Sequence, residues 1–186
     1  MIFFLRNIPN ILTGLRLGAA PALALLLLSG HEGAAFVVFV LAGLTDVADG
    51  WLAKRFRLAT RFGRWLDPTA DKLLMLVAFL TLSQMGATPI WLTAVVIGRD
   101  AAIVLGIIVA KLMELPLRVA PLPAGKFSTF MQLGYVALIL FLLAFDFDWQ
   151  TVRAVAAILT GAATILSWIA YGQLWLRAAA RGRRTA

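Results

Sequence analysis

Four aspartates lie close together in an otherwise apolar chain, and they constrain the fold and the function more than any other feature. Asp46 and Asp49 are followed, after one short connection, by Asp67 and Asp71. Carboxylates inside apolar segments are costly and seldom occur there without a functional role. Because carboxylate oxygens bind hard divalent cations, the cluster predicts a metal site in a membrane protein. A metal site in a membrane suggests chemistry on lipids.

The composition places the chain in the membrane. Hydrophobic residues make up 62% of the 186 residues and charged residues 14%, whereas a soluble domain is about half apolar and about a quarter charged. We therefore predict an all-α integral membrane protein with a single domain over residues 1–186. We attribute the net charge of +8 to Lys and Arg residues that lie in cytoplasmic loops and face anionic lipid. Nucleic-acid binding is not expected, because the basic residues flank apolar segments.

Six apolar segments are long enough to cross a bilayer, which takes about 20 helical residues. They cover residues 8–29, 33–55, 65–84, 89–112, 125–145 and 149–176, and residues 1–6 are predicted to form a short interfacial helix. Turns are expected at 30–33, at 86–89 and around Asp146 and Asp148. Three prolines predict an ordered or interfacial loop at 115–124. Tryptophans near span ends, such as Trp91, Trp149 and Trp175, are predicted to be interface anchors.

Basic residues are concentrated at one set of span ends, which predicts the topology. These ends carry Arg6, Lys54, Arg55, Arg57, Arg61, Arg64, Lys111, Arg118, Lys126 and the arginines of the tail 177–186. The opposite ends carry Arg153. The positive-inside rule then puts both termini in the cytoplasm, as an even number of spans requires. We expect a bacterial inner-membrane protein with its site at the cytoplasmic face.

The spacing of the aspartates predicts that four carboxylates converge at the membrane surface. Asp46 and Asp49 are three residues apart on one predicted helix, and Asp67 and Asp71 are four apart on the next. Like charges this close require a compensating cation, and an all-oxygen donor set favours Mg²⁺ or Mn²⁺. One alternative is that the acids only pair with loop arginines. A more remote one is a divalent-cation channel or transporter, which the gathering of the acids at one end disfavours.

Small and basic residues beside the acids suit a phosphate ligand. Gly50 and Ala53 continue the helix face of Asp49 and leave space for a nucleotide or a headgroup. Gly63 is expected to do the same before the second aspartate pair. Lys54 and the loop arginines supply positive charge for phosphates.

These residues follow the signature of the CDP-alcohol phosphatidyltransferases, which pairs an Asp-x-x-Asp-Gly-x-x-Ala-Arg segment with a later Gly-x-x-x-Asp-x-x-x-Asp segment. The chain matches the spacing from Asp46 to Asp71, with Lys54 where the family usually has arginine. A lysine keeps the charge but loses the planar fork of arginine. Residues 7–16 resemble the first helix of the family, so the resemblance covers most of the chain.

The resemblance implies an enzyme that transfers a phosphatidyl group from CDP-diacylglycerol to an alcohol and releases CMP. Asp46, Asp49 and Asp67 would be metal ligands, and Asp71 would be partly a ligand and chiefly the catalytic base. The resemblance further implies two Mg²⁺ or Mn²⁺ ions and a homodimer. The residues expected at the donor are Asn10, Thr13, Asp49, Gly50, Ala53, Lys54 and Gly63.

Weaker features predict the acceptor alcohol. Segments 40–46 and 96–100 resemble the cardiolipin synthases of the family, which use phosphatidylglycerol. Segment 125–132 is similar both to these enzymes and to the phosphatidylglycerophosphate synthases, which use glycerol 3-phosphate. The latter usually carry Ala-Arg-Glu where Gly-Arg-Asp stands at 98–100. Phosphatidylglycerol is therefore the favoured acceptor, and glycerol 3-phosphate is the alternative.

Basic residues in the later spans are candidates for binding an acceptor phosphate. They are Arg99, Arg118 and Lys126. Arg99 stands beside Asp100, however, and could equally form a structural ion pair inside the helix bundle.

Overall fold

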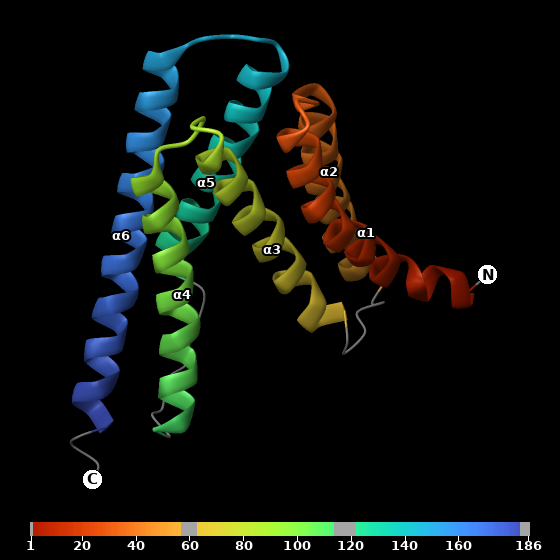
Figure 1. Ribbon diagram of the computed structural model, residues 1–186. Helices are drawn as coiled ribbons and strands as arrows, with labels where there is room; N and C mark the ends of the chain where they lie inside the picture. The colour runs from red at the N-terminus through yellow and green to blue at the C-terminus, as the bar shows by residue number, and fades with distance from the viewer. Residues whose placement is uncertain (1, 57–62, 114–121, 183–186) are drawn as a thin grey trace. The chain divides into compact units, whose positions relative to one another are not determined.

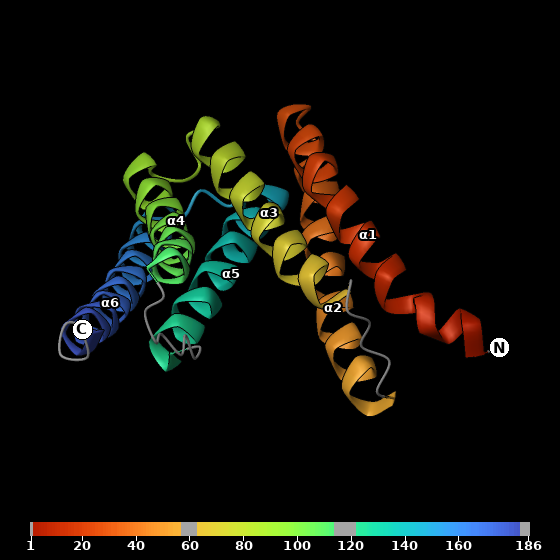
Figure 2. The same cartoon turned by 90° about the horizontal axis from the view of Figure 1, so that it is seen from below.

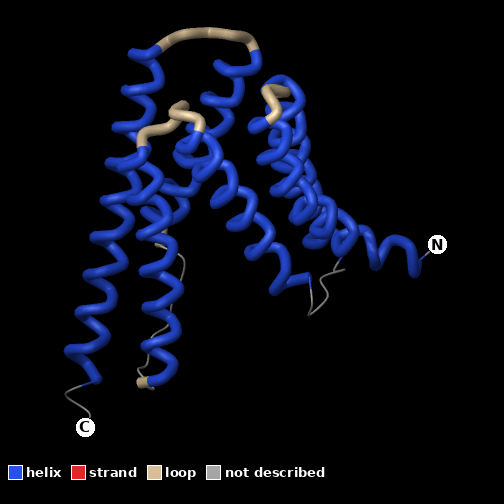
Figure 3. The backbone as a smooth tube through the Cα atoms, in the orientation of Figure 1, coloured by secondary structure: helices blue, strands red, loops and turns tan. Residues whose placement is uncertain are grey.

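The computed structural model describes residues 2–56, 63–113 and 122–182, with side chains at 14–45, 70–113 and 122–176. Within these residues the chain forms six helices and no strand (Figure 3). They are α1 (Ile2–Leu28), α2 (Glu32–Phe56), α3 (Gly63–Gln84), α4 (Ile90–Leu112), α5 (Pro123–Ala144) and α6 (Gln150–Gly182). The all-helical prediction is confirmed for the described chain, and each helix overlaps one predicted segment.

Two helix bounds differ from the prediction by more than two residues, at the start of α1 and at the end of α6. Residues 2–6 continue α1 and do not form an interfacial helix of their own. The helix continues through Pro9, a residue that more often ends or kinks a helix. At the other end, α6 runs on to Gly182 and includes part of the basic tail.

Three helices are long and apolar enough to cross a membrane within the described residues. They are α4, α5 and the Gln150–Leu176 portion of α6. The apolar stretches of α1 and α2 are shorter, at Gly14–Leu28 and Glu32–Thr45. Length and composition therefore support membrane insertion most directly for the second half of the chain.

Helices α1, α3 and α5 end in the same kind of turn, at the predicted breaks. After α1, the amide of His31 donates to the carbonyl of Leu26 at 2.8 Å, and Gly30 has a φ of 76°. Gly86, also with a φ of 76°, ends α3 in the same way, and Asp146, with a φ of 55°, ends α5. Such turns satisfy the last carbonyls of a helix and require one left-handed residue. At position 146 that residue carries a side chain, although glycine adopts this conformation at lower cost.

The helices form two compact units. The first unit contains residues 1–87 and 136–149, and the second contains residues 88–135 and 150–186. Helix α5 contributes its first part to the second unit and its last part to the first.

In the first unit, α1 packs against both α2 and α3 (Figures 1 and 2). Helix α1 buries one residue per turn, at Arg16, Ala20, Leu23 and Leu27, each at most 2% exposed. The buried apolar residues described on the other two helices are Ala35, Phe39, Ala42, Ala70, Leu74, Ala78, Phe79 and Leu82. Small residues in this set allow the helices to approach closely. An arginine therefore occupies a position in an otherwise apolar stripe of α1.

In the second unit, α4 and α6 lie side by side and run parallel (Figure 1). Aromatic side chains of each helix pack on glycines of the other. The pairs are Trp91 on Gly161, Trp168 on Gly98 and Trp175 on Gly106. On α6 these positions recur every seven residues, which is the repeat of helices that coil in parallel. A Cβ on any of the three glycines would lie within 3.3 Å of an indole atom, so the close approach depends on glycine.

Gly161→Ala is expected to lower the thermal stability of the purified protein. The new methyl group would lie 2.6 Å from the ring of Trp91, and overpacking of this kind costs about 1–3 kcal/mol. Thermal unfolding in detergent would measure the loss. Gly134→Ala is the matched control, because a Cβ at Gly134 meets nothing within 4 Å. Equal unfolding temperatures for the two variants would contradict the packing described here.

Candidate active site

The four aspartates lie on two helices of the first unit. Helix α2 carries Asp46 and Asp49, and α3 carries Asp67 and Asp71. Both helices contact α1. The predicted helical spacings are confirmed by the backbone, since each pair falls within one continuous helix. The side chains of Asp46, Asp49 and Asp67 lie outside the described residues, and the convergence of the four carboxylates stays a prediction.

The side chain of Asp71 forms an ion pair with Arg16 of α1. The two atoms in contact, Arg16 Nη1 and Asp71 Oδ1, are 2.9 Å apart. The arginine side chain is 1% exposed and the aspartate side chain is 43% exposed. A buried guanidinium requires an opposite charge nearby, because desolvation without one is costly. The buried Arg16 therefore holds the carboxylate of Asp71 in place, while that carboxylate remains accessible to solvent.

The donor chemistry of the aspartates fits a hard divalent cation. The predicted ligands offer only carboxylate oxygens, the chain has no cysteine, and its single histidine, His31, is exposed in the turn after α1. Oxygen donors suit Mg²⁺ or Mn²⁺, whereas zinc prefers nitrogen and sulfur. Among the described side chains no three His, Cys, Asp or Glu residues cluster, and three of the four predicted ligands lie outside that set. The metal site stays a prediction.

The residues predicted to bind the donor all fall on helices of the first unit. Asn10 and Thr13 are in α1, Gly50, Ala53 and Lys54 are in α2, and Gly63 begins α3. Their side-chain environments lie outside the described part of the chain, and so does the whole of Arg118. Their roles stay predictions.

Arg99 joins α4, α5 and α6 within the second unit. Its Nη1 is 2.6 Å from Asp100 Oδ1, and its Nη2 donates to Ser167 Oγ at 2.9 Å. The same nitrogen is 3.5 Å from the carbonyl oxygen of Gly125, and the guanidinium carbon lies 5.7 Å from the ring centroid of Tyr171. These contacts match the structural ion pair that was the alternative for this residue. Binding of an acceptor phosphate by Arg99 stays a prediction.

Lys126 differs from Arg99 in its surroundings. It follows Gly125 on α5, so Arg99 reaches the backbone beside it, but Lys126 itself is exposed. An exposed ammonium on a flexible stem can meet a phosphate at little cost in desolvation.

Comparison with known protein families decides the class of this protein. The family model for CDP-alcohol phosphatidyltransferase matches residues 6–173. The chain belongs to the CDP-alcohol phosphatidyltransferase family. The resemblance read from the aspartate signature is thus confirmed. The protein is a membrane-associated transferase of phospholipid biosynthesis, and the channel alternative is set aside.

Relatives of this phosphatidyltransferase carry names for two different acceptors. A probable phosphatidylglycerophosphate synthase of Mycobacterium tuberculosis is 39% identical over 173 residues, covering 89% of this chain and 78% of the relative. A CDP-diacylglycerol--glycerol-3-phosphate 3-phosphatidyltransferase of Bacillus subtilis is 34% identical over 150 residues, covering 72% and 76%. A cardiolipin synthase (CMP-forming) of Rattus norvegicus is 36% identical over 111 residues, covering 59% and 37%. Similarity alone leaves the acceptor open.

Arg16 is the candidate functional residue of this phosphatidyltransferase that sequence reasoning missed. Its place in the first-helix segment was noted, but no role followed. The available signal was periodicity, because Arg16 is followed at helical spacing by Ala20, Leu23 and Leu27. A charge inside such a stripe predicts a partner of opposite charge, although the stripe does not say which acid that partner is.

Proposed function

We propose that this phosphatidyltransferase transfers the phosphatidyl group of CDP-diacylglycerol to phosphatidylglycerol, forming cardiolipin and releasing CMP. Glycerol 3-phosphate is the alternative acceptor. The observation that carries the proposal is the ion pair between Arg16 and Asp71, which fixes a carboxylate at the last position of the family signature. The preference for phosphatidylglycerol rests on the resemblance of segments 40–46 and 96–100 to cardiolipin synthases.

In the proposed reaction Asp71 acts as the general base. Its carboxylate takes the proton of the acceptor hydroxyl while that oxygen bonds to the β-phosphorus, which carries diacylglycerol. The bond from this phosphorus to the bridging oxygen breaks, and CMP leaves with the electron pair. Arg16 holds one carboxylate oxygen at 2.9 Å and so keeps the base in one orientation. Preorganisation of this kind lowers the cost of reaching the reactive geometry.

Asp46, Asp49 and Asp67 would hold the divalent ions, with Asp71 as a shared ligand. Bound Mg²⁺ or Mn²⁺ would neutralise the pyrophosphate and stabilise the departing CMP. Helical register supports the grouping, because Asp46 follows the buried Ala42 by four residues along α2. On α3, Asp67 precedes Asp71 by the same interval. The donor would pack beside Gly50 and Ala53, near Lys54 and Gly63, and beside Asn10 and Thr13 of α1.

We propose that all six helices span the membrane, with both termini and the active site at the cytoplasmic face of a bacterial inner membrane. The parallel course of α4 and α6 supports this topology, because it brings Lys111 and the basic end of α6 to the same side. Residues 1–186 would act as one catalytic domain, as the continuous family match over 6–173 suggests. A homodimer is expected from the family resemblance, and nucleic acid is not expected as a partner.

CMP release by the purified protein tests this proposal. The assay supplies CDP-diacylglycerol with Mg²⁺ or Mn²⁺ and compares phosphatidylglycerol with glycerol 3-phosphate as acceptor. Turnover with phosphatidylglycerol, lost on addition of a chelator, is the expected result. Turnover with glycerol 3-phosphate alone would overturn the acceptor and keep the family chemistry. Equal turnover with and without chelator would overturn the metal site.

A further inference from the structure

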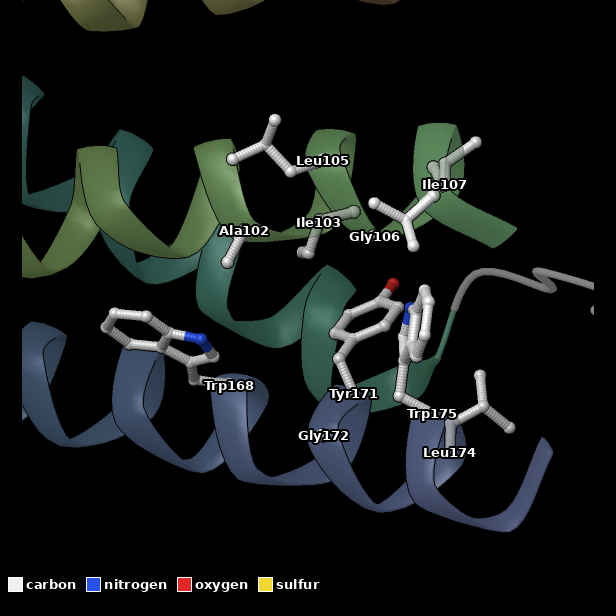
Figure 4. A pocket seen from close by; sticks show the side chains of 11 residues that line it. Ala102, Ile103, Leu105, Gly106, Ile107, Trp168, Tyr171, Gly172, Leu174 and Trp175 are labelled. Carbon is white, nitrogen blue, oxygen red and sulfur yellow. The ribbon is translucent and has the colours of Figure 1, made fainter. Parts of the chain in front are cut away.

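The second unit contains a groove between α4 and α6 that the proposed reaction does not use. Its volume is about 390 Å³, within the range of about 300–1,000 Å³ that is usual for ligand pockets. Figure 4 shows Trp168 beside one part of the groove and Tyr171 with Trp175 beside another. From Trp168 to Trp175 the helix rises by roughly 10 Å, so the groove is elongated along the helices.

The lining of the groove is apolar. Side chains such as Ala102 and Ile103 of α4 face the aromatic rings of α6 (Figure 4), and none of the lining residues is charged. The hydroxyl oxygen of Tyr171 already accepts a hydrogen bond from the amide of Leu122 at 3.4 Å. The groove therefore offers ring faces and aliphatic carbon, and it suits an apolar ligand.

The location of the groove between two candidate membrane spans indicates which kind of apolar ligand can reach it. Both walls belong to candidate membrane spans, Ile90–Leu112 and Gln150–Leu176. A ligand that enters there comes from the bilayer, where acyl chains are the abundant apolar molecules. Lys111 is exposed in the last turn of α4, two residues beyond the lining residue Val109. A basic residue at the end of a span attracts anionic headgroups.

We propose that the groove between α4 and α6 binds one acyl chain of an anionic phospholipid, with its phosphate at Lys111. The site would hold a membrane lipid against the second unit. This inference goes beyond the transfer reaction and does not depend on which acceptor the enzyme uses.

Gly172 provides the substitution that tests the groove. It lines the groove, and a Cβ built on it meets nothing within 4 Å. A leucine side chain at this position would therefore enter the groove without a clash at its first atom. Gly106 is less suitable, because a Cβ there would lie 2.6 Å from Trp175 Nε1. Gly134 of α5 is the matched control, since it also has open space and does not line the groove.

The experiment is photolabelling of the full-length protein in phosphatidylcholine nanodiscs that contain phosphatidylglycerol with a diazirine in one acyl chain. We expect saturable labelling of peptides from 102–109 and 168–175. Gly172→Leu should weaken it about tenfold, as expected for lost contact with about two methylene groups, and Gly134→Leu should leave it unchanged. Lys111→Gln should weaken labelling by phosphatidylglycerol but not by an equivalent phosphatidylcholine probe.

Two results would overturn the proposal. Labelling that rises linearly with probe and covers all exposed helix faces would indicate general contact with lipid. Saturable labelling that Gly172→Leu leaves unchanged would place the chain elsewhere. Saturation is measured on the unaltered protein, so the first result does not depend on the folding of a variant. CMP release in the same nanodiscs reports separately on the transfer reaction.

Discussion

Asp71→Asn is expected to lower the rate of CMP release by about 10²–10⁴-fold, the usual contribution of a general base. The amide oxygen of asparagine can still accept a hydrogen bond from Arg16, but asparagine cannot take a proton at neutral pH. The shape of the site and the packing of α1 on α3 should therefore survive. Affinity for CDP-diacylglycerol should stay close to that of the unaltered enzyme, measured by equilibrium binding alongside turnover.

Asp49→Ala is the contrasting control for this prediction. It removes a predicted metal ligand, so the metal-dependent part of donor binding should be lost together with turnover. The two variants thus separate loss of chemistry from loss of binding. Near-normal CMP release by Asp71→Asn would refute the assignment of the base. Loss of donor binding by Asp71→Asn to the same extent as by Asp49→Ala would make Asp71 chiefly a metal ligand.

Local features of the fold could be predicted because they depend on nearby residues. Gly30, Gly86 and Asp146 interrupt apolar runs, and each provides the left-handed residue that ends a helix. The family signature likewise depends on spacing along α2 and α3, and continuous helices preserve that spacing. The prediction that residues 1–6 form a separate helix was wrong, because α1 continues through Pro9, which more often ends or kinks a helix.

Contacts between helices could not be predicted in the same way, because they depend on which faces meet. Trp91 and Trp175 each pack on a glycine of the neighbouring helix, a contact that the sequence did not predict. Their role as anchors at the membrane interface stays a prediction. Only the pairing of α4 with α6 gives Gly161 and Gly106 their role. Arg16 is a similar case, because a charge in the apolar stripe of α1 predicts an acidic partner, and the packing of α1 on α3 selects Asp71.

Arg16→Ala is expected to reduce both stability and turnover. Removing one partner of a buried ion pair costs about 3–5 kcal/mol of stability. Because the Asp71 side chain is 43% exposed, solvent screens the pair, and the expected loss of stability lies at the lower end of this range. The carboxylate would also lose the contact that orients it, and a misplaced catalytic group costs on the order of 10²-fold in rate. Arg16→Lys keeps the charge but not the planar fork, so it should recover part of the rate. Donor affinity should change little in either variant.

A second variant of the same stripe separates orientation of the base from packing of the core. Leu23 is fully buried on α1, about two helical turns beyond Arg16. Leu23→Ala should destabilise the protein by about 2–5 kcal/mol. Because Leu23 is an apolar core residue and Asp71 keeps Arg16 in this variant, CMP release per folded molecule should be unchanged. CMP release and the folded fraction are therefore measured on both Leu23→Ala and Arg16→Ala, at a temperature where both variants are largely folded. If Leu23→Ala and Arg16→Ala lower turnover per folded molecule equally, Arg16 only supports the core. If only the arginine variant loses turnover, and Arg16→Lys restores part of it, Arg16 positions the base.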